Sequence, residues 1–484
     1  MQFDSWQFIA FFILVTAAFR LVSVRSRWLL FLMASYVFYM AWKPEYVFLL
    51  LFSTSVDYVS AIRMNSSRST AARGGWLCFS LVANLGVLFL YKYYGLFQST
   101  WSTVTSSYGL ADMLPRSNLV LPVGISFYTF QSLAYTIDVF RGDLPAEKHF
   151  GRFALYVVFY PQLVAGPIER ADRLLPQLNF ERSPNHDDIV VGFRHILWGL
   201  FKKMVVSDRM AEAVDLAYSA PVEHAGLGSI VATVFFALQI YADFSGYSDI
   251  AIGSARIYGV RLMDNFRQPY FALNPRDFWS RWHISLSTWF RDYLYIPLGG
   301  NKGGPSRRIR NIILVFGLSG LWHGAAWHYV IWGLLHAGYY LAFHEGERLI
   351  PGMDRALRNR RGAFGSWLAT LVLVLVAWIF FRASSVPSAL FMIRNLFSDA
   401  AGWTDPQHLR HVFWGLNLSR MDVIIIACCN ATELLFEWQN EKGPVCERLS
   451  SAPFPLRWAL YLALALAILN LSPGEAIPFA YFQF

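Results

Sequence analysis

Residues 312–343 form one apolar stretch, IILVFGLSGLWHGAAWHYVIWGLLHAGYYLAF, of 32 residues without Asp, Glu, Lys or Arg. A straight helix of that length would extend about 48 Å at about 1.5 Å per residue, whereas the hydrocarbon core of a bilayer is about 30 Å thick. Two full crossings would need about 40 residues. The stretch therefore predicts a broken or re-entrant membrane element, for which Gly317, Gly320, Gly324 and Gly333 are candidate break points.

The composition of the whole chain places this element in a membrane protein. Of the 484 residues, 55% are hydrophobic and 15% are charged, whereas soluble proteins average about 45–50% apolar and about 25% charged residues. These values exclude a disordered chain, a coiled coil and a secreted disulfide scaffold, and they predict an all-α, polytopic membrane protein. No long polar segment interrupts the apolar pattern, so we predict a single membrane domain over residues 1–484.

The other apolar stretches are further candidate membrane segments. They cover residues 8–22, 28–42, 46–62, 75–97, 119–140, 153–165, 189–206, 227–253, 367–381, 421–435 and 456–471. Several are shorter than the about 20 residues that a crossing needs, so we predict about ten or eleven crossings together with broken pieces. The stretch 189–206 carries Arg194, Lys202 and Lys203, which favours a position of part of it along the membrane surface.

Basic residues predict the orientation of the first spans. Arg20 lies near the end of the first span, with Arg25 and Arg27 after it, and three more arginines follow the third span: Arg63, Arg68 and Arg73. Because Lys and Arg are enriched in cytoplasmic loops, both loops are predicted to be cytoplasmic and the N-terminus to face outward.

A further cytoplasmic segment is predicted between residues 261 and 310, where basic and aromatic residues occur together. This segment contains nine Lys and Arg but only three Asp, and its excess of positive charge is about two thirds of the net charge of +9 of the whole chain. The basic residues are Arg261, Arg267, Arg276, Arg281, Arg291, Lys302, Arg307, Arg308 and Arg310. One interpretation is an interfacial segment whose Trp and Tyr lie at headgroup level. The other is a partly buried cradle whose arginines face the phosphates of an anionic ligand from the cytoplasm. Neither interpretation involves nucleic acid.

His323, within Trp322-His323-Gly324, is predicted at membrane depth, where an ionisable side chain is a functional candidate. His328 and His336 share the same stretch, but on a helix His328 would lie about 140° away from His323. No HExxH motif occurs and no carboxylate lies one turn from His323, so we predict no metal site and assign His328 and His336 to packing or to the membrane interface.

Other catalytic classes lack their motifs. The chain contains no GxSxG elbow, Walker loop or GxGxxG fingerprint. A histidine-centred reaction remains, in which a neutral imidazole takes a proton from a hydroxyl or thiol as that group attacks an acyl carbonyl.

Several motifs resemble one family. The run RDFWSRWHISLSTWFRDYLYIPLGGN at 276–301 and GLWHG at 320–324 resemble the two signatures of the membrane-bound O-acyltransferases (MBOAT). LPVGISFYTFQ at 121–131, YPQLVAGPIER at 160–170, QIYADFSGY at 239–247 and PFAYFQF at 478–484 resemble its bacterial polysaccharide O-acetyltransferase branch, of the alginate O-acetyltransferase membrane-subunit type. The resemblance extends over nearly the whole chain.

This resemblance implies a fold and a reaction. The fold would be a bundle of about 11 transmembrane helices, with re-entrant or broken helices around a central tunnel, in the bacterial inner membrane. The branch takes an acetyl group from a cytoplasmic thioester such as acetyl-CoA, and no permanently bound cofactor is implied. The acetyl group passes across the membrane to polysaccharide hydroxyls, directly or through a periplasmic partner protein.

The resemblance also implies roles for individual residues. His323 would be the catalytic histidine, acting as general base, and a covalent acyl-imidazole is the less favoured variant. His283 would orient the substrate or His323. Donor binding, or support of the signature loop, is implied for Arg281, Trp282, Arg291, Asp292, Tyr295, Asn301 and Trp322. Asp243 is a further intramembrane candidate that we expect to be paired.

Two other classes of function remain open on the sequence. A transporter or export-complex subunit would share the many spans and intramembrane polar groups. Against it, the sequence shows no pair of matching halves and no chain of intramembrane carboxylates. A membrane scaffold would give no reason for two histidine signatures.

Overall fold

The protein is described from a computed structural model, in which residues 1–109, 114–115, 119–473 and 477–479 are placed. Within these residues the regular structure is entirely helical, which confirms the all-α prediction. Residues 480–484 of the C-terminal motif at 478–484 lie outside the described residues.

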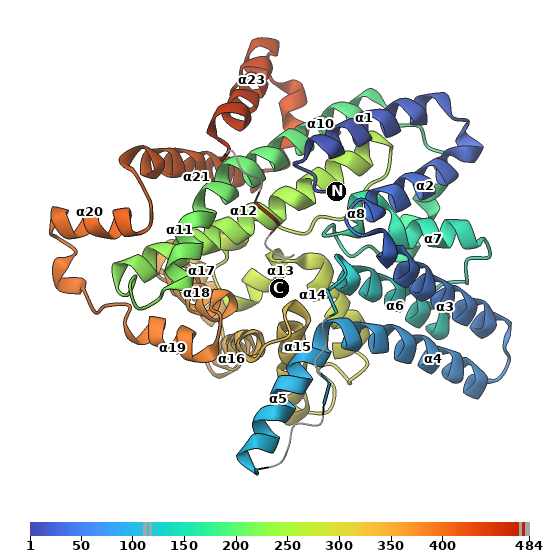
Figure 1. Ribbon diagram of the computed structural model, residues 1–484, viewed down its shortest axis with the longest axis horizontal. Helices are drawn as coiled ribbons and strands as arrows, with labels where there is room; N and C mark the ends of the chain where they lie inside the picture. The colour runs from blue at the N-terminus through green and yellow to red at the C-terminus, as the bar shows by residue number, and fades with distance from the viewer. Residues whose placement is uncertain (110–113, 116–118, 474–476, 480–484) are drawn as a thin grey trace. The chain divides into compact units, whose positions relative to one another are not determined.

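The chain forms two compact units, Met1–Phe193 with Ile250–Met263, and Arg194–Asp249 with Asp264–Phe484. A single domain over residues 1–484 therefore stays a prediction. The first unit contains α1 (Trp6–Leu21), α2 (Arg27–Met40), α3 (Val47–Ser66), α4 (Thr70–Leu88), α5 (Tyr94–Ser107), α6 (Ile125–Arg141), α7 (Phe150–Val158), α8 (Tyr160–Leu163) and α9 (Ala171–Leu174). Figure 1 shows α3 and α4 side by side, with α6 close to both.

Two helices, α10 (His186–Leu200) and α12 (Leu227–Ile257), contribute residues to both units. The second unit adds α11 (Asp208–Ser219), α13 (Pro275–Arg281), α14 (Ile284–Phe290), α15 (Pro305–His323), α16 (Trp327–Leu349), α17 (Met353–Arg358), α18 (Arg360–Arg382), α19 (Val386–Arg394), α20 (Pro406–Gly415), α21 (Arg420–Asn440), α22 (Val445–Arg448) and α23 (Phe454–Leu471). Short π-helical segments connect α4 to α5 (η3, Phe89–Tyr93), α10 to α11 (η5, Phe201–Ser207) and follow α14 (η7, Arg291–Tyr295).

Five helical segments are long and apolar enough to cross a membrane: Pro44–Ser66, Thr70–Ser107, Leu227–Ile257, Gly362–Arg382 and Phe454–Leu471. The bent pair of α20 and α21, with 79° between its helices, passes the same test together and makes six among the described residues. The chain is thus a membrane protein with several spans. Eleven transmembrane helices around a central tunnel stay a prediction.

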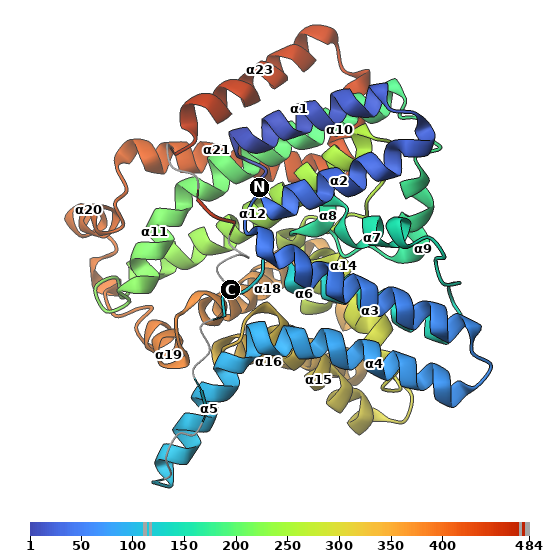
Figure 2. The same cartoon turned by 45° about the vertical axis from the view of Figure 1, so that its right-hand side comes forward.

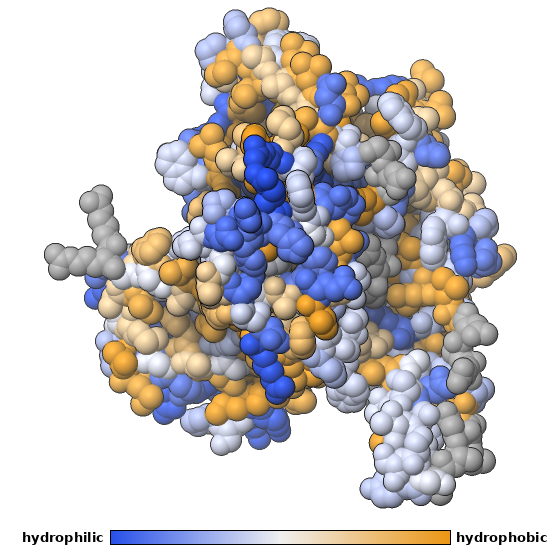
Figure 3. Space-filling view, turned by 60° about the vertical axis from the view of Figure 1, so that its left-hand side comes forward, coloured by the Kyte–Doolittle hydropathy of each residue, from blue (hydrophilic) through white to orange (hydrophobic). Residues whose placement is uncertain are grey.

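The surface is consistent with a lipid environment. Apolar side chains cover large areas of the face in Figure 3, alongside a group of hydrophilic side chains. No residue within the apolar window of α23 is buried, and its leucines, such as Leu462 and Leu469, are exposed. Exposed apolar surface of this extent on a helix of spanning length is typical of contact with lipid.

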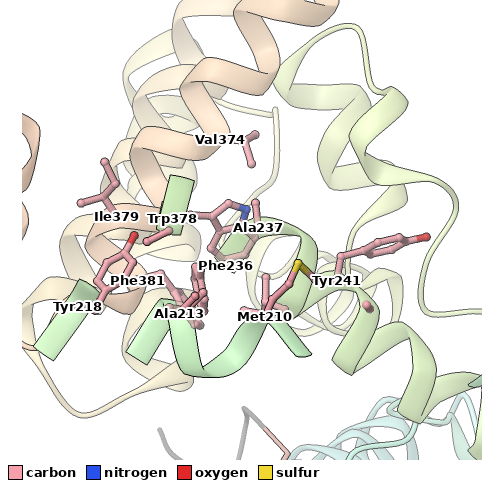
Figure 4. Packing of buried hydrophobic residues seen from close by; sticks show 14 of the residues in the cluster. Met210, Ala213, Tyr218, Phe236, Ala237, Tyr241, Val374, Trp378, Ile379 and Phe381 are labelled. Atoms are coloured by element: carbon pink, nitrogen blue, oxygen red, sulfur yellow. The ribbon is translucent and has the colours of Figure 1, made fainter. Parts of the chain in front are cut away.

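The core of the second unit lies between α11, α12 and α18. Phe236 and Ala237 of α12 pack there with Trp378 and Phe381 of α18 and Met210 of α11 (Figure 4). The Phe236 and Trp378 rings meet edge to face with 5.9 Å between centroids. This aromatic core extends to the rings around the candidate site.

The basic residues of α10 and η5 have a different environment from the one predicted. Arg194, Lys202 and Lys203 are at most 5% exposed. Arg194 donates hydrogen bonds to the Tyr461 hydroxyl at 2.7 Å and to the Cys446 carbonyl at 2.8 Å. The prediction that this segment lies partly along the membrane surface is therefore wrong for these three side chains, because protein groups rather than lipid headgroups satisfy them.

Candidate active site

The stretch 312–343 is broken, as predicted. It forms the end of α15 and most of α16, which are separated by residues 324–326. Gly324 is at this break, and a Cβ there would lie 2.0 Å from the Tyr329 ring. The break leaves His323 as the last residue of α15, facing the first turns of α16.

Two other predicted break points, Gly320 and Gly333, have another role, because they let α15 and α16 pack closely. A Cβ on Gly320 would lie 2.2 Å from the Tyr329 carbonyl oxygen, and a Cβ on Gly333 would lie 2.1 Å from that of Phe316. Small residues at a helix interface allow two backbones to approach in this way. The prediction of a chain break is wrong at these two positions and at Gly317, because all three lie inside continuous helices.

His323 is enclosed by aromatic rings and is 3% exposed. Its ring centroid is 5.0 Å from that of Trp322, 5.0 Å from that of Trp332 and 5.4 Å from that of Phe381, all in edge-to-face contact. Trp332 comes from α16 and Phe381 from α18. Neither residue could be singled out from the sequence, because apolar helices contain many aromatic residues and only the packing selects these two.

His283 is presented by a strained turn between α13 and α14. Its φ is 44°, in the left-handed region, and its side chain is fully buried. A residue other than glycine in this region costs about 1–3 kcal/mol, and such residues cluster at functional sites. Burial lowers the pKa of His283 to about 3, so its imidazole is neutral near pH 7.

Asn265 holds the turn that carries His283. Its carbonyl oxygen accepts a hydrogen bond from the backbone N–H of Ile284 at 2.9 Å. Its Oδ1 accepts from the Ser285 backbone at 3.2 Å and from the Ser285 hydroxyl at 2.9 Å. Asn265 is the main residue that the sequence analysis missed, since a single Asn in a loop carries no signal before its partners are known.

The structure brings the two signature histidines together. The ring centroids of His283 and His323 are 6.1 Å apart, with 57° between their planes. Trp322 lies beside both, 5.8 Å from His283, and Phe244 of α12 meets His283 edge to face at 4.7 Å. The arrangement places two imidazoles in one aromatic, water-poor environment, where a neutral ring can accept a proton.

Trp282 supports this arrangement from the preceding position. It is fully buried and stacks on Phe278 with 5.6 Å between ring centroids. Trp378 of the core lies 5.1 Å from it on another side. Trp282 is thus part of the packing that connects the turn of His283 to the core.

Several of the predicted donor-binding arginines form ion pairs within the protein. Arg281 pairs with Asp277, one turn earlier, at 2.8 Å and also with Glu441. Arg291 pairs with its neighbour Asp292 at 2.7 Å. These pairs support a structural role for Arg281, whereas the pair of Arg291 and Asp292 lies nearer the surface.

Other residues of the segment 261–310 also have partners within the protein. Arg276 pairs with Glu347 at 2.6 Å, and Arg308 pairs with Glu345. The Tyr295 hydroxyl donates to Asn301 Oδ1 at 2.5 Å.

Three exposed basic residues, Lys302, Arg307 and Arg310, form no ion pair with any described acidic side chain. They surround the start of α15, the helix that ends at His323. The positive end of a helix dipole favours anions, so this concentration of cationic side chains is suited to a ligand with phosphate groups.

Asp243 is paired, on the side of α12 that faces η5. Lys203 Nζ lies 3.0 Å from Asp243 and 2.8 Å from Asp208, and it donates to the Ile477 carbonyl at 2.9 Å. Asp243 is adjacent to Phe244 in α12, which contacts His283. The ion pair therefore anchors the part of α12 that borders the two histidines.

A second cluster of charges, which the sequence analysis missed, surrounds Lys202. Its Nζ lies 2.5 Å from Asp249, which also contacts His195 at 3.0 Å. Glu433 and Glu437 of α21 are buried and interact electrostatically with the same lysine. This cluster could not be recognised in the sequence, because its carboxylates come from helices that are far apart in the chain.

His328 and His336 have packing contacts away from His323. His328 Nδ1 lies 3.0 Å from the carbonyl oxygen of Phe380. His336 accepts a hydrogen bond from Trp279 Nε1 at 3.2 Å and stacks on Phe278 with 5.9 Å between ring centroids.

Comparison with known proteins identifies the family. The MBOAT family profile, that of the membrane-bound O-acyltransferase family, matches residues 144–386, the range that contains both histidines. The chain belongs to this family. It is 35% identical to the probable alginate O-acetylase AlgI of Azotobacter vinelandii over 100% of both chains.

Two further relatives are named as transferases for polymers other than alginate. A peptidoglycan O-acetyltransferase of Helicobacter pylori is 34% identical over 75% of this chain and 72% of its own. A teichoic acid D-alanyltransferase of Bacillus subtilis is 29% identical over 56% of this chain and 68% of its own.

The protein is thus an O-acyltransferase. Family membership decides against the transporter and the scaffold that the sequence left open.

Proposed function

We propose that the protein transfers an acetyl group from a cytoplasmic thioester, acetyl-CoA, across the bacterial inner membrane to hydroxyls of an extracytoplasmic polysaccharide such as alginate. The acetyl group reaches the polymer directly or through a periplasmic acetyltransferase or other polysaccharide-modifying partner. The single observation that carries the proposal is the pair of imidazoles, His283 and His323, 6.1 Å apart within aromatic walls.

In this proposal His323 acts as general base. One ring nitrogen takes the proton of the acceptor hydroxyl as its oxygen attacks the thioester carbonyl carbon, and the C–S bond breaks when the tetrahedral intermediate collapses. The imidazolium then returns the proton to the leaving thiolate, so the products are an ester and a free thiol. General acid–base catalysis of this kind contributes about 10²–10⁴-fold. The rings of Trp322, Trp332 and Phe381 would keep water away from the thioester.

His283 is proposed to orient rather than to exchange protons with solvent. Its pKa of about 3 keeps it neutral, so it can hold the acceptor hydroxyl or the thioester by a hydrogen bond. The hydrogen bonds that Ser285 donates to Asn265 fix the turn in which His283 lies, and a fixed ring loses little entropy in the transition state.

The donor is proposed to approach along α15. The phosphates of the donor would contact Lys302, Arg307 and Arg310 near the first residue of α15. The acyl group of the donor would reach toward His323, the last residue of α15. The segment 261–310, which contains these basic residues, is predicted to be cytoplasmic, and acetyl-CoA would also come from the cytoplasm. Arg291, Asp292, Tyr295 and Asn301 would shape this entrance.

The acceptor is proposed to enter from the opposite side. A groove of about 1170 Å³ lies between α11, the turn before α21 and the C-terminal residues Pro473, Ile477 and Pro478, and its lining also includes Asp208. These two residues bind Lys203, whose other partner, Asp243, precedes the residue that contacts His283. These contacts connect the lining of the groove to the surroundings of His283, and the acceptor is proposed to pass from this groove to the histidines through the central tunnel expected of the family.

The test uses the full-length protein in vesicles with acetyl-CoA labelled in the acetyl group and an oligosaccharide acceptor. We expect His323→Gln to lower acetyl transfer by about 10²–10⁴-fold. His328→Gln, in the neighbouring helix, is the matched control and should retain near wild-type transfer. Wild-type transfer by a folded His323→Gln variant would contradict the proposal.

A further inference from the structure

The helices α3, α4 and α6 of the first unit enclose a polar cluster centred on Asp57. Figure 2 shows α3 and α4 side by side, and α6 packs on both. All three faces that meet carry a polar residue on successive turns: Ser53, Asp57 and Ser60 on α3, Ser80 and Asn84 on α4, and Ser132 and Thr136 on α6. These side chains are at most 3% exposed.

One oxygen of the Asp57 carboxylate is fully engaged by donors. Oδ1 accepts hydrogen bonds from the Ser80 hydroxyl at 2.6 Å and from Asn84 Nδ2 at 2.7 Å. The Ser53 hydroxyl donates to Asn84 Oδ1, which fixes the direction of that amide. Two donors on one oxygen favour the ionised form of a carboxylate.

The other side of the cluster has polar atoms left over. Asp57 Oδ2 and the Ser60 hydroxyl are buried without a hydrogen bond of regular geometry among the described residues, and the Ser132 hydroxyl also interacts with the carboxylate. A buried polar atom without a partner costs about 1–3 kcal/mol, and a buried charge costs much more. Some further group is therefore needed at Oδ2.

Asp57 also lacks a basic partner. Asp188, Asp208 and Asp243, the other aspartates that are as deeply buried, each lie within 4 Å of a Lys or Arg nitrogen. Among the described residues no Lys, Arg or His forms an ion pair with Asp57. In a helix of spanning length, an ionisable residue in this environment is a functional candidate.

We propose that Asp57 is the centre of a binding site for a small monovalent cation, Na⁺. Carboxylate and hydroxyl oxygens are the ligands of hard cations, and Oδ2 with the Ser60 hydroxyl supplies the first two. A single carboxylate balances one positive charge, whereas a divalent ion would leave a net charge inside the bilayer. The bound ion would hold α3, α4 and α6 together.

The test is the thermal unfolding of the full-length protein in detergent, with NaCl exchanged for N-methyl-D-glucamine chloride at constant ionic strength. A ligand that binds only the folded state raises Tm with its concentration. We expect wild-type Tm to rise by about 3 °C or more over about 200 mM Na⁺, and Asp57→Asn to abolish the rise.

Two further variants keep the test decisive if Asp57→Asn does not fold. Ser60→Ala removes a proposed ligand that makes no hydrogen bond, so it should shift the Na⁺ response to higher concentration. Thr54→Val, on the same helix, removes a hydroxyl that donates to the Leu50 carbonyl outside the cluster, and it should retain the response. Equal wild-type Tm in both salts, with a change only when pH is varied, would show a protonated Asp57 and overturn the proposal.

Discussion

The site at His283 and His323 and the cluster at Asp57 both bury titratable side chains among helices, but their surroundings are of opposite character. The two imidazoles lie among aromatic rings, with Trp322 and Phe244 beside them. The carboxylate lies among hydroxyl and amide groups.

The difference follows from the charge that each group carries. An imidazole can remain neutral when it is buried and still accept a proton, so apolar walls are tolerated and also keep water out. A buried carboxylate that is ionised needs polar partners and a counter-charge. The aromatic site is suited to chemistry, and the hydroxyl-lined site is suited to binding an ion.

The largest expected effect tests whether the two sites act independently. His323→Gln should reduce acetyl transfer by about 10²–10⁴-fold, because the general base is lost. The same variant should keep the wild-type dependence of Tm on Na⁺, since the ion site belongs to other helices. Transfer assays and thermal unfolding of the same preparation measure both. Loss of the Na⁺ response in this variant would show that the two sites are not independent.

The next effect concerns the packing that places His323. Gly333→Ala puts a Cβ 2.1 Å from the Phe316 carbonyl oxygen, so α15 and α16 must separate. Overpacking of this kind costs about 1–3 kcal/mol, and we expect a lower Tm together with at least about tenfold slower transfer.

Gly338→Ala is the matched control in the same helix, because no atom lies within 4 Å of the added Cβ. It should be neutral or stabilising by up to about 1 kcal/mol, as Ala favours the helix. Equal effects of the two substitutions would contradict the proposed close contact.

A smaller effect is expected at the turn of His283. Asn265→Ala leaves the Ser285 N–H and hydroxyl without their acceptor, which costs about 1–3 kcal/mol. Transfer should slow through kcat, because the turn no longer fixes the ring. A double-mutant cycle with Ser285→Ala should give non-additive changes, whereas additive changes would show that the pair is not coupled.

The smallest effect is expected at the start of α15. Lys302→Gln and Arg307→Gln should each raise KM for acetyl-CoA a few-fold with little change in kcat, and the effect should weaken at high salt. Arg291→Gln is the comparison, because Arg291 is already paired with Asp292. If Arg291→Gln raised KM more than Lys302→Gln, the proposed position of the phosphates would be wrong.

Much of the architecture could be predicted from the sequence. Three features are properties of the sequence itself and can be recognised without knowledge of any contact: the apolar composition, the broken stretch 312–343 and the two histidine motifs. The family follows from the same motifs and from their order along the chain.

Contacts between distant segments could not be predicted in this way. That Arg281 pairs with Glu441 and that Glu433 lies near Lys202 depends on how α21 packs, and residues more than 150 positions apart give no pattern in the sequence. The same holds for Gly320 and Gly333, since a glycine that breaks a helix and a glycine that lets two helices approach look alike until the neighbouring backbone is placed.

The sequence by itself determined that this is a helical membrane protein with a broken element and two signature histidines, because hydrophobicity and motif spacing are properties of the chain alone. Only the tertiary structure decided which rings surround His323, which arginines are already neutralised, and that Asp57 has no basic partner among the described residues. The physical reason is that burial, charge compensation and close packing depend on neighbours in space, which folding brings together from distant parts of the chain.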